Sequence, residues 1–476
     1  MKKIIISVLH AVILLITPMV VLAAVTFAAP CQYDETFLGE LKDKHARLAS
    51  VEGEKIVVIG GSSMAFGLDS ALLEEYTGMP VVNYGLYATI GTKAMLDMSR
   101  PYIGKGDIVV ICPETDEQTY SLYYNAHSMW QALDCDLSML KDAGFSNYGK
   151  LLAVLPEFTA EKLGFIRTDS KPSPSGIYAE SSFNEYGDIS VPRPYNEMPA
   201  FYDSSMAISL TTDLLNEEFV EYLNEYAAYC SLRGADVYFS FSPINADAVV
   251  STAEDRTEFY RSLGEQLHFP VISDVNDYIL DSAYFYDTNF HLNSRGALLR
   301  TSLLADDLLR VMGRTERVET VKYTAPTRPE DYFSLKFNSD ENAKYYLCEE
   351  IEGGLMITGL TEEGKSQTTL QIPRGVDGKA VLAIGDNAFA GSDVLETVII
   401  GEYAAVRSLT TEALAGCPTL QRIEVYVAPS ALPVDIETLN RMPEGCSVYI
   451  PAEAYSEFAT DYFWSSKMKF VETLGE

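Results

Sequence analysis

Short apolar runs alternate with longer amphipathic stretches between residues 53 and 313. The runs 55–60, 106–113 and 234–243 are apolar through their centres and end at Gly or Pro. Such runs are typical of parallel strands that are buried on both faces. The stretch 217–232 before the third run has the spacing of a helix that packs on one face. This order predicts an α/β domain with a mainly parallel sheet over residues 53–313.

Three further stretches define loops and the end of this domain. Residues 170–200 are rich in Ser, Pro, Gly and Tyr and show no clean period, which predicts a long loop or lid. Apolar residues recur every three or four positions in 294–312, so a final helix is expected there, with Asn293 as its N-cap. Residues 314–330 contain two prolines and mixed charge, which predicts a linker.

An internal repeat distinguishes residues 331–476. The segment 381–398 aligns with 406–423 at a constant offset, with its apolar positions in register. A repeat of this length is typical of a leucine-rich solenoid, in which each unit buries its apolar face against its neighbours. The motif in 384–389 resembles the BspA-like leucine-rich repeats of bacterial surface proteins. The second copy departs from that motif at Thr410, where Gly is expected, and at Leu414, where Phe is expected.

Residues 1–29 have the pattern of a membrane-targeting segment. Lys2 and Lys3 precede a stretch, 4–29, that contains no Asp, Glu, Lys or Arg. This stretch exceeds the roughly 20 residues that span a bilayer, so we expect an uncleaved anchor, with cleavage and secretion as the alternative. The basic pair belongs on the cytoplasmic side, which predicts an extracytoplasmic location for the rest of the chain. A juxtamembrane helix is expected in 30–52.

Composition narrows the function classes. Of the 476 residues, 68 are acidic and 35 are Lys or Arg, which gives a formal net charge of −33. No long basic run is present, so nucleic acid is excluded as a partner. The seven cysteines are scattered and contain no Cys-x-x-Cys pair. This spacing excludes a zinc ribbon and a dense disulfide scaffold, and it leaves an isolated disulfide open.

Two loops of the α/β domain carry the candidate chemistry. The first buried strand runs directly into a Gly-Ser turn at 60–63, where a Ser hydroxyl and its amide can face the same bound atom. Asp287 and His291 lie four residues apart, immediately before the final helix. A carboxylate so placed can fix the tautomer of an imidazole and stabilise its protonated form. A plain loop is the alternative for the Gly-Ser turn.

A Ser after the first strand, combined with an Asp and a His near the end of the domain, resembles the SGNH (GDSL-like) hydrolases. The resemblance implies a flavodoxin-like three-layer fold for residues 53–313. It implies that Ser62 is the nucleophile, His291 the general base and Asp287 the residue that orients the base. It also implies an oxyanion hole built from the backbone N–H groups of Ser62 and Ala88, with Ala88 where Gly is usual.

The chain departs from this family after the third strand. Glu114 stands in the block where the family has an Asn that donates to the oxyanion, so one side-chain donor lacks a counterpart. The Asp also lies four residues before the His rather than the usual three. Gly61, Asn83, Gly85 and Glu114 are the remaining predicted substrate contacts.

The resemblance implies a serine esterase that needs neither a metal nor an organic cofactor. Esters, often acetyl groups on sugars, are the substrates of the family, and a membrane anchor would bring the enzyme close to cell-surface glycans. The repeat domain is expected to bind a protein or glycan ligand. Two alternatives remain: an O-acyltransferase that uses the same triad, and a non-catalytic cell-surface adhesion protein. The intact triad favours the enzyme, whereas Glu114 and the appended repeats favour the adhesion protein.

Overall fold

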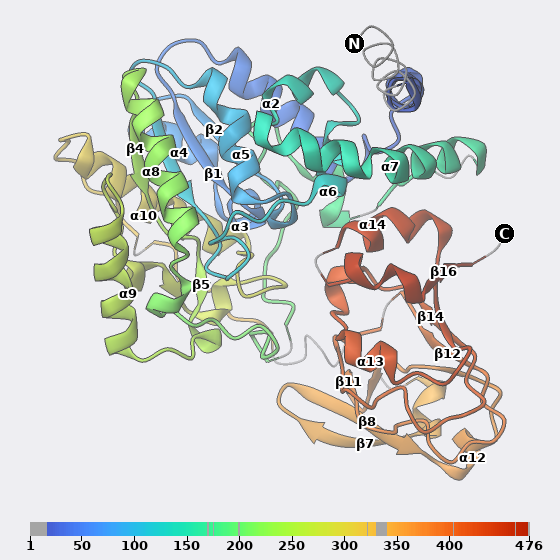
Figure 1. The fold of residues 1–476 in the computed structure, drawn as a ribbon. Helices are drawn as coiled ribbons and strands as arrows, with labels where there is room; N and C mark the ends of the chain where they lie inside the picture. The colour runs from blue at the N-terminus through green and yellow to red at the C-terminus, as the bar shows by residue number, and fades with distance from the viewer. Residues whose placement is uncertain are drawn as a thin grey trace, which may run out of the picture.

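The computed structural model describes residues 17–168, 171–174, 176–198, 200–320, 322–329, 340–402, 404–461 and 463–474. Figure 1 shows an α/β domain, coloured blue to yellow, beside a C-terminal domain of strands and short helices in orange and red. The two domains have separate apolar cores. The mixed α/β class and the parallel sheets expected from the sequence are therefore present.

A four-stranded parallel sheet forms the centre of the α/β domain, in the order β2-β1-β3-β4. The strands β1 (Ile56–Gly60), β2 (Val81–Gly85) and β3 (Ile108–Cys112) are buried at every position, and β4 (Asp236–Phe239) is an edge strand. Complete burial explains why these runs lack polar alternation. Beyond β4, the segment 270–273 adds a single parallel bridge, between Phe239 and Val271.

Helices cover both faces of this sheet because alternate strand residues point in opposite directions. On one face, Ile56 and Val58 of β1 pack in one core with Leu304 and Leu308. On the other face, Val57 and Ile59 join the larger core. The helices of the domain are α2 (Leu41–Ser50), α3 (Ser62–Gly67), α4 (Ser70–Thr77), α5 (Thr92–Ser99), α6 (Ala126–Leu133), α7 (Tyr148–Thr168), α8 (Glu217–Leu232), α9 (Ala253–Gln266) and α10 (Ser294–Val311).

The final helix of the domain forms as expected. The Asn293 side chain accepts hydrogen bonds from the backbone N–H groups of Arg295 and Gly296, which caps α10. The helix expected in 30–52 also forms, as α2, but it is not a separate juxtamembrane element. It packs against β2, and its His45 is buried with Nδ1 2.8 Å from the Tyr84 hydroxyl.

The described part of the N-terminal segment is helical over residues 17–28. Thr26 on this helix is fully buried, and its Oγ1 lies 2.5 Å from Oγ1 of Thr159 on α7. Residues 1–16 of the expected membrane anchor lie outside the described residues. Within the part that is described, no helix combines the length and apolarity needed to cross a membrane.

The loop expected at 170–200 packs tightly on the elements that follow β1 and β2. The backbone N–H of Ile189 donates to the carbonyl of Ala65 over 2.9 Å. The buried Asp188 accepts from both the backbone N–H and the hydroxyl of Ser70. These contacts hold the loop against α3 and α4, close to the carboxyl edge of the sheet.

One of the two five-stranded sheets of the C-terminal domain is a parallel ladder with the period seen in the sequence. It has the strand order β16-β15-β14-β12-β9. Val398 pairs with Ile423, and Ile423 pairs with Val448, so successive strands follow one another at the offset of the sequence repeat. The strands of this sheet are β9 (Thr369–Gln371), β12 (Thr397–Ile400), β14 (Arg422–Val425), β15 (Ser447–Ile450) and β16 (Val471–Thr473).

A second sheet and three short helices complete this domain. In that sheet Ile384 pairs with Leu409, which is its counterpart in the second copy of the repeat. Its strands are β7 (Tyr346–Ile351), β8 (Gly354–Leu360), β10 (Gly375–Val376), β11 (Lys379–Ile384) and β13 (Ser408–Leu409). The helices are α12 (Glu362–Lys365), α13 (Ile436–Asn440) and α14 (Tyr455–Thr460).

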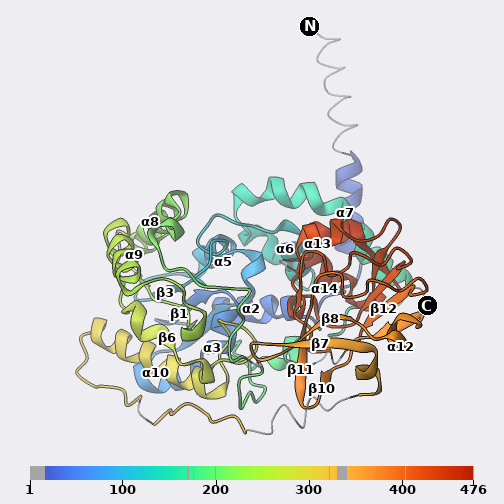
Figure 2. The ribbon, with the colours of Figure 1, turned by 90° about the horizontal axis from the view of Figure 1, so that it is seen from below.

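The two domains touch along one side of the α/β domain. Figures 1 and 2 both place α14 beside α6 and α7. A second contact joins the Tyr202 hydroxyl to Glu352 over 3.2 Å. A cavity of about 170 Å³ lies between the domains, lined by Phe37, Tyr87 and Tyr178 on one side and by Pro429, Ser430, Ala454 and Glu457 on the other.

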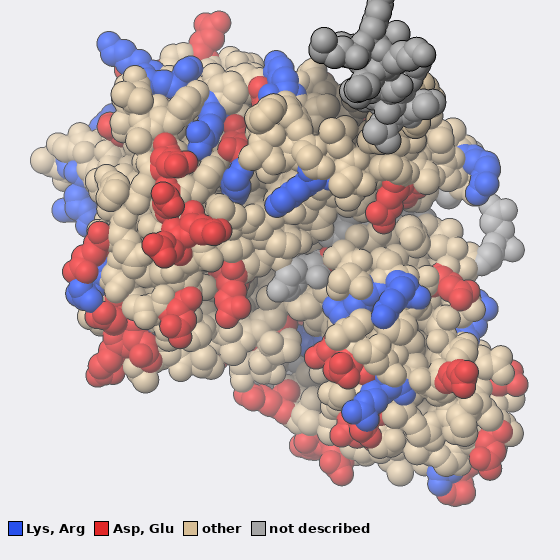
Figure 3. Space-filling model, viewed as in Figure 1, with Lys and Arg blue, Asp and Glu red and all other residues tan. Residues whose placement is uncertain are grey.

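The negative charge of the chain is distributed over both domains. On the face seen in Figure 3, Asp and Glu side chains cover parts of the α/β domain and of the repeat domain, with Lys and Arg between them. The basic side chains on this face are scattered and form no continuous stripe that could follow a phosphate backbone.

Candidate active site

Ser62 is the first residue of α3 and follows β1 after a Gly-Gly turn. A Cβ on Gly60 would lie 2.4 Å from the backbone carbonyl oxygen of Cys112 on β3, so position 60 requires glycine. A Cβ on Gly61 would lie 2.7 Å from Glu114 Oε1, the end of a side chain that can rotate away. Gly60 therefore lets the chain pass close to β3 and bring Ser62 to the carboxyl edge of the sheet.

Asp287 and His291 lie in a closed loop before α10. The backbone N–H of Tyr286 donates to the carbonyl of His291 over 2.8 Å, and the His291 N–H donates to Thr288 Oγ1 over 3.0 Å. These bonds fold the loop back on itself. The carboxylate of Asp287 consequently reaches the ring of His291 across a spacing of four residues.

The three residues form a continuous chain of hydrogen bonds. His291 Nε2 lies 2.9 Å from Ser62 Oγ, and His291 Nδ1 lies 2.9 Å from Asp287 Oδ1. Ser62 and His291 are only 5% and 6% exposed. An Nδ1–H that donates to the carboxylate leaves Nε2 as the acceptor for the Ser62 hydroxyl proton. The juxtaposition expected from the sequence is thus present in the structure.

An aromatic and a cationic side chain hold the imidazole in place. The ring of Phe66, on α3, stacks on His291 with centroids 4.0 Å apart and planes inclined by 4°. The guanidinium of Arg193 lies over Phe66 and donates to the carbonyls of Phe66 and Leu292. Burial lowers the pKa of Arg193 to about 10, which leaves it charged at neutral pH.

Tyr178 is a fourth member of the hydrogen-bonded chain. Its hydroxyl donates to Asp287 Oδ2 over 2.6 Å, so both oxygens of that carboxylate are engaged. Burial and the charge of Asp287 raise the pKa of Tyr178 well above its usual value, which keeps the hydroxyl protonated. The sequence did not identify this role, because Tyr178 lies in the aperiodic loop at 170–200.

Glu114 also contacts the hydroxyl of Ser62. Its Oε1 accepts from that hydroxyl over 3.1 Å and from the backbone N–H of Ser63 over 2.7 Å. The hydroxyl of Ser62 has one proton, so Glu114 competes for it with His291. The residue departs from the family pattern in sequence, and in the structure it contacts the candidate nucleophile itself.

The other predicted contacts divide into two groups. Ala88 adjoins the Gly-Ser turn, since its Cα lies 3.4 Å from the position of a Cβ on Gly61. Asn83 is fully buried, and its amide donates to the Met64 carbonyl and to Asp188, while its Oδ1 accepts from Gly85 N–H. These bonds give Asn83 a structural role that ties β2 to α3, and they argue against contact with substrate for Asn83 and Gly85.

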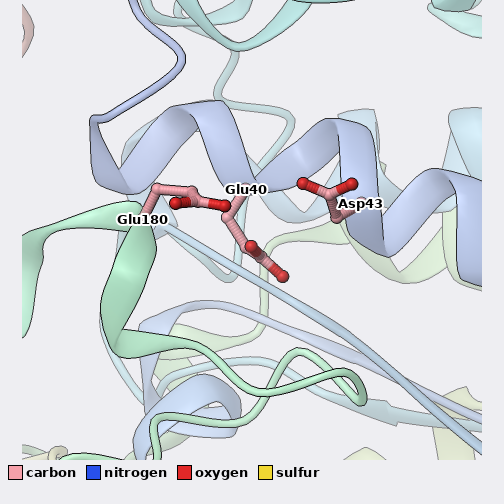
Figure 4. A group of neighbouring side chains, drawn as sticks. All are labelled: Glu40, Asp43 and Glu180. Carbon is pink, nitrogen blue, oxygen red and sulfur yellow. The ribbon is translucent and has the colours of Figure 1, made fainter.

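A group of three carboxylates lies elsewhere, where η1 (Phe37–Glu40), α2 and η7 (Glu180–Ser182) meet. Figure 4 shows Glu40, Asp43 and Glu180 converging there. Burial raises the pKa of Glu40 to about 8 and lowers that of the adjacent Lys44 to about 8. Lys44 donates to the carbonyls of Asn83 and Gly187, so Lys44 connects α2 to β2.

Comparison of the sequence with family models and with curated proteins gives no match. A buried hydroxyl within 2.9 Å of an imidazole, whose other nitrogen contacts a carboxylate at the same distance, is able to transfer its proton to that imidazole. The arrangement suits nucleophilic attack on an acyl group.

Proposed function

We propose that this protein is an SGNH-type serine esterase, exported and held at the membrane by its N-terminal segment. The observation that carries the proposal is the hydrogen-bonded chain Ser62, His291 and Asp287, in which Ser62 at the start of α3 meets His291 from a loop 229 residues further on. Helices on both faces of a parallel sheet, with the chain of residues at its carboxyl edge, agree with the three-layer architecture of that family.

The mechanism follows from the positions of these groups. His291 takes the hydroxyl proton of Ser62 as the oxygen attacks the ester carbonyl, and Asp287 stabilises the imidazolium that results. The backbone N–H groups of Ser62 and Ala88 stabilise the oxyanion. His291 then gives the proton to the leaving alcohol, and water releases the acyl group from Ser62 by the same route in reverse.

Glu114 must move away from Ser62 or be displaced by substrate during this cycle. Its Oε1 accepts a hydrogen bond from the backbone N–H of Ser63, the residue after the proposed nucleophile, so that N–H is not available to a substrate. A carboxylate at this position opposes the negative charge that develops in the transition state. This contact is the observation that favours the alternative of a non-catalytic binding protein.

The C-terminal domain is proposed to be a BspA-like leucine-rich solenoid that helps to bind the substrate or a surface ligand. The agreement between the strand register and the sequence repeat supports the solenoid. Its residues Pro429 and Ala454 face Tyr87 and Tyr178 across the shared cavity. That geometry favours a repeat domain that forms one wall of a ligand-binding cavity. Acetyl esters of cell-surface glycans are the proposed substrates.

Ester cleavage by the purified chain tests the proposal directly. We expect hydrolysis of short acyl esters by the wild type and a loss of at least roughly 1000-fold in kcat for Ser62→Ala. Ser63→Ala is the matched control, because it keeps the backbone N–H and removes a buried hydroxyl that has no partner among the described residues. Equal activity of the wild type and Ser62→Ala would exclude Ser62 as the nucleophile.

A second assay separates the esterase from the adhesion protein. If the wild type shows no turnover and Ser62→Ala binds immobilised glycans as well as the wild type does, the triad has no catalytic role. Transfer of the acyl group to an added sugar alcohol in place of water would indicate the O-acyltransferase.

A further inference from the structure

Two thiols that are distant in sequence meet on the surface of the α/β domain. Cys31 follows the helix of residues 17–28, and Cys135 follows α6. Their Sγ atoms lie 2.6 Å apart, and both residues are partly exposed. In the described part of the chain, no other two cysteine sulfurs are in hydrogen-bonding contact.

The chain on both sides of Cys31 is fixed by buried contacts. The backbone N–H of Gln32 donates to Asp134 Oδ2 over 2.7 Å. The other oxygen of Asp134 accepts from Lys162 over 2.5 Å, and this ion pair is at most 1% exposed. Lys162 also donates to the carbonyl of Thr26. The two sulfurs are therefore brought together by a defined packing arrangement.

We propose that Cys31 and Cys135 form a disulfide that fastens the N-terminal segment to the α/β domain. The oxidant is a thiol–disulfide oxidoreductase or a small disulfide of an oxidising compartment. The proposal rests on the extracytoplasmic location given under the proposed function, because cytosolic thiols are kept reduced. It is independent of the chemistry at Ser62.

The exchange proceeds through a mixed disulfide. A hydrogen bond from the Cys135 thiol lowers the pKa of Cys31, so Cys31 ionises first. Its thiolate attacks the disulfide of the oxidant, forming a mixed disulfide and releasing one thiolate of the oxidant, which takes up a proton. Cys135 then loses its proton and attacks Cys31 Sγ, and the second sulfur of the oxidant leaves as a thiol. Two protein thiols are oxidised, and one disulfide is reduced to two thiols.

The bond would constrain one wall of the cavity between the domains. It joins residues 104 positions apart, and Tyr33 and Phe37 in the segment after Cys31 both line that cavity. Cys31 also lies just beyond Ala29, the end of the apolar stretch. If that stretch is cleaved off, the disulfide would hold the N-terminus left by cleavage beside α6. If it is not cleaved, the disulfide would hold the same place in the longer chain.

Thiol counting and peptide mapping of the full chain test the proposal. The chain is purified with reductant and then incubated with oxidised and reduced glutathione at the ratio of an exported compartment. We expect five alkylated cysteines out of the seven in the chain, and one linked peptide containing Cys31 and Cys135. Cys31→Ser and Cys135→Ser should each lower the oxidised protein's Tm by roughly 5 °C, and the double variant by no more than either.

Cys348→Ser in the repeat domain is the matched control, because that residue is also partly exposed and should leave the linked peptide and the Tm unchanged. Seven alkylated cysteines after incubation would overturn the proposal, as would a linked peptide with a different cysteine. Ester cleavage is measured on the same samples. Its absence together with an intact linked peptide would count against the esterase alone.

Discussion

The carboxylate of Glu114 lies 3.1 Å from the Ser62 hydroxyl, which is also in contact with His291. In a serine hydrolase a negative charge at this place would raise the energy of the transition state, because the attacking oxygen and the oxyanion both carry negative charge there. If the proposed esterase activity is present, Glu114 would therefore restrain it until a ligand displaces the carboxylate.

Replacing Glu114 with Gln should increase ester cleavage. The substitution keeps the volume and removes the charge, so it weakens the competition for the Ser62 proton and the repulsion of the oxyanion. We expect kcat/KM for a short acyl ester to rise at least roughly 10-fold, because like charges about 4 Å apart interact by a few kcal/mol near a protein surface and about 1.4 kcal/mol of barrier is tenfold in rate. Glu117→Gln, an exposed change in the same loop, is the control. A fall in kcat/KM would instead indicate that Glu114 takes part in catalysis.

Tyr178→Phe should slow the chemical step while leaving the fold intact. The change removes the hydrogen bond to Asp287 Oδ2 and a longer contact of 3.4 Å with His291 Nδ1, and it keeps the ring that lines the cavity. A hydrogen bond to a charged group contributes about 1.5–3 kcal/mol, so kcat should fall roughly 10- to 100-fold at unchanged KM. In an Asp287→Asn background the same change should have little further effect, because the two residues act through one carboxylate. Independent, additive losses would argue against this role.

Arg193→Met should destabilise the protein. The guanidinium is 3% exposed and donates to four carbonyls, those of Phe66, Ile189, Val191 and Leu292. Methionine fills much of the space but leaves these acceptors without their donor. We expect a loss of about 3 kcal/mol or more in the free energy of unfolding, measured by urea titration. Arg256→Met serves as the comparison, because Arg256 donates to two acceptors, the backbone carbonyl of Ser251 and Asn276 Oδ1. If Arg193→Met loses no more free energy of unfolding than Arg256→Met does, water replaces the guanidinium at these carbonyls.

The sequence predicted the framework of the site but not the residues that brace it. Completely buried strands such as β1 and β3 leave a clear apolar signal, and the Gly-Ser turn and the Asp-His loop are local motifs. Tyr178 and Arg193 lie in a loop without periodicity, and their partners are 109 and 99 residues away, so only tertiary packing reveals them. Glu114 was visible as a departure from a pattern, whereas its contact with Ser62 was not.

Tertiary packing was also not predicted for the expected juxtamembrane helix and for the repeat domain. The helix expected beside the membrane is α2, whose His45 and Lys44 are buried against β2 and its neighbours. The repeat period predicted the strand register, because each apolar position stacks on its counterpart in the next unit. Nothing in that period indicates that the domain packs against α6 and α7.

Glu457, which lines the cavity between the domains, makes the stability of the folded protein depend on pH. Burial, with the nearby charge of Asp461, raises the pKa of Glu457 to about 7. The folded protein therefore keeps a proton that the unfolded chain loses at an ordinary Glu pKa of about 4.3. Because the folded state binds more protons, stability falls as the pH rises through this interval and is lowest, for this group, above about pH 7.

Glu457→Gln removes this penalty without removing the side chain. The Tm of the variant should exceed that of the wild type at pH 8 by roughly 1 to 3 °C and should match it at pH 4.5. Differential scanning calorimetry at both pH values measures the difference. Glu444→Gln, an exposed change in the same domain, should show no such dependence. A variant that is less stable at pH 8 would show that the ionised Glu457 has a favourable partner across the interface, and that its charge holds the domains together.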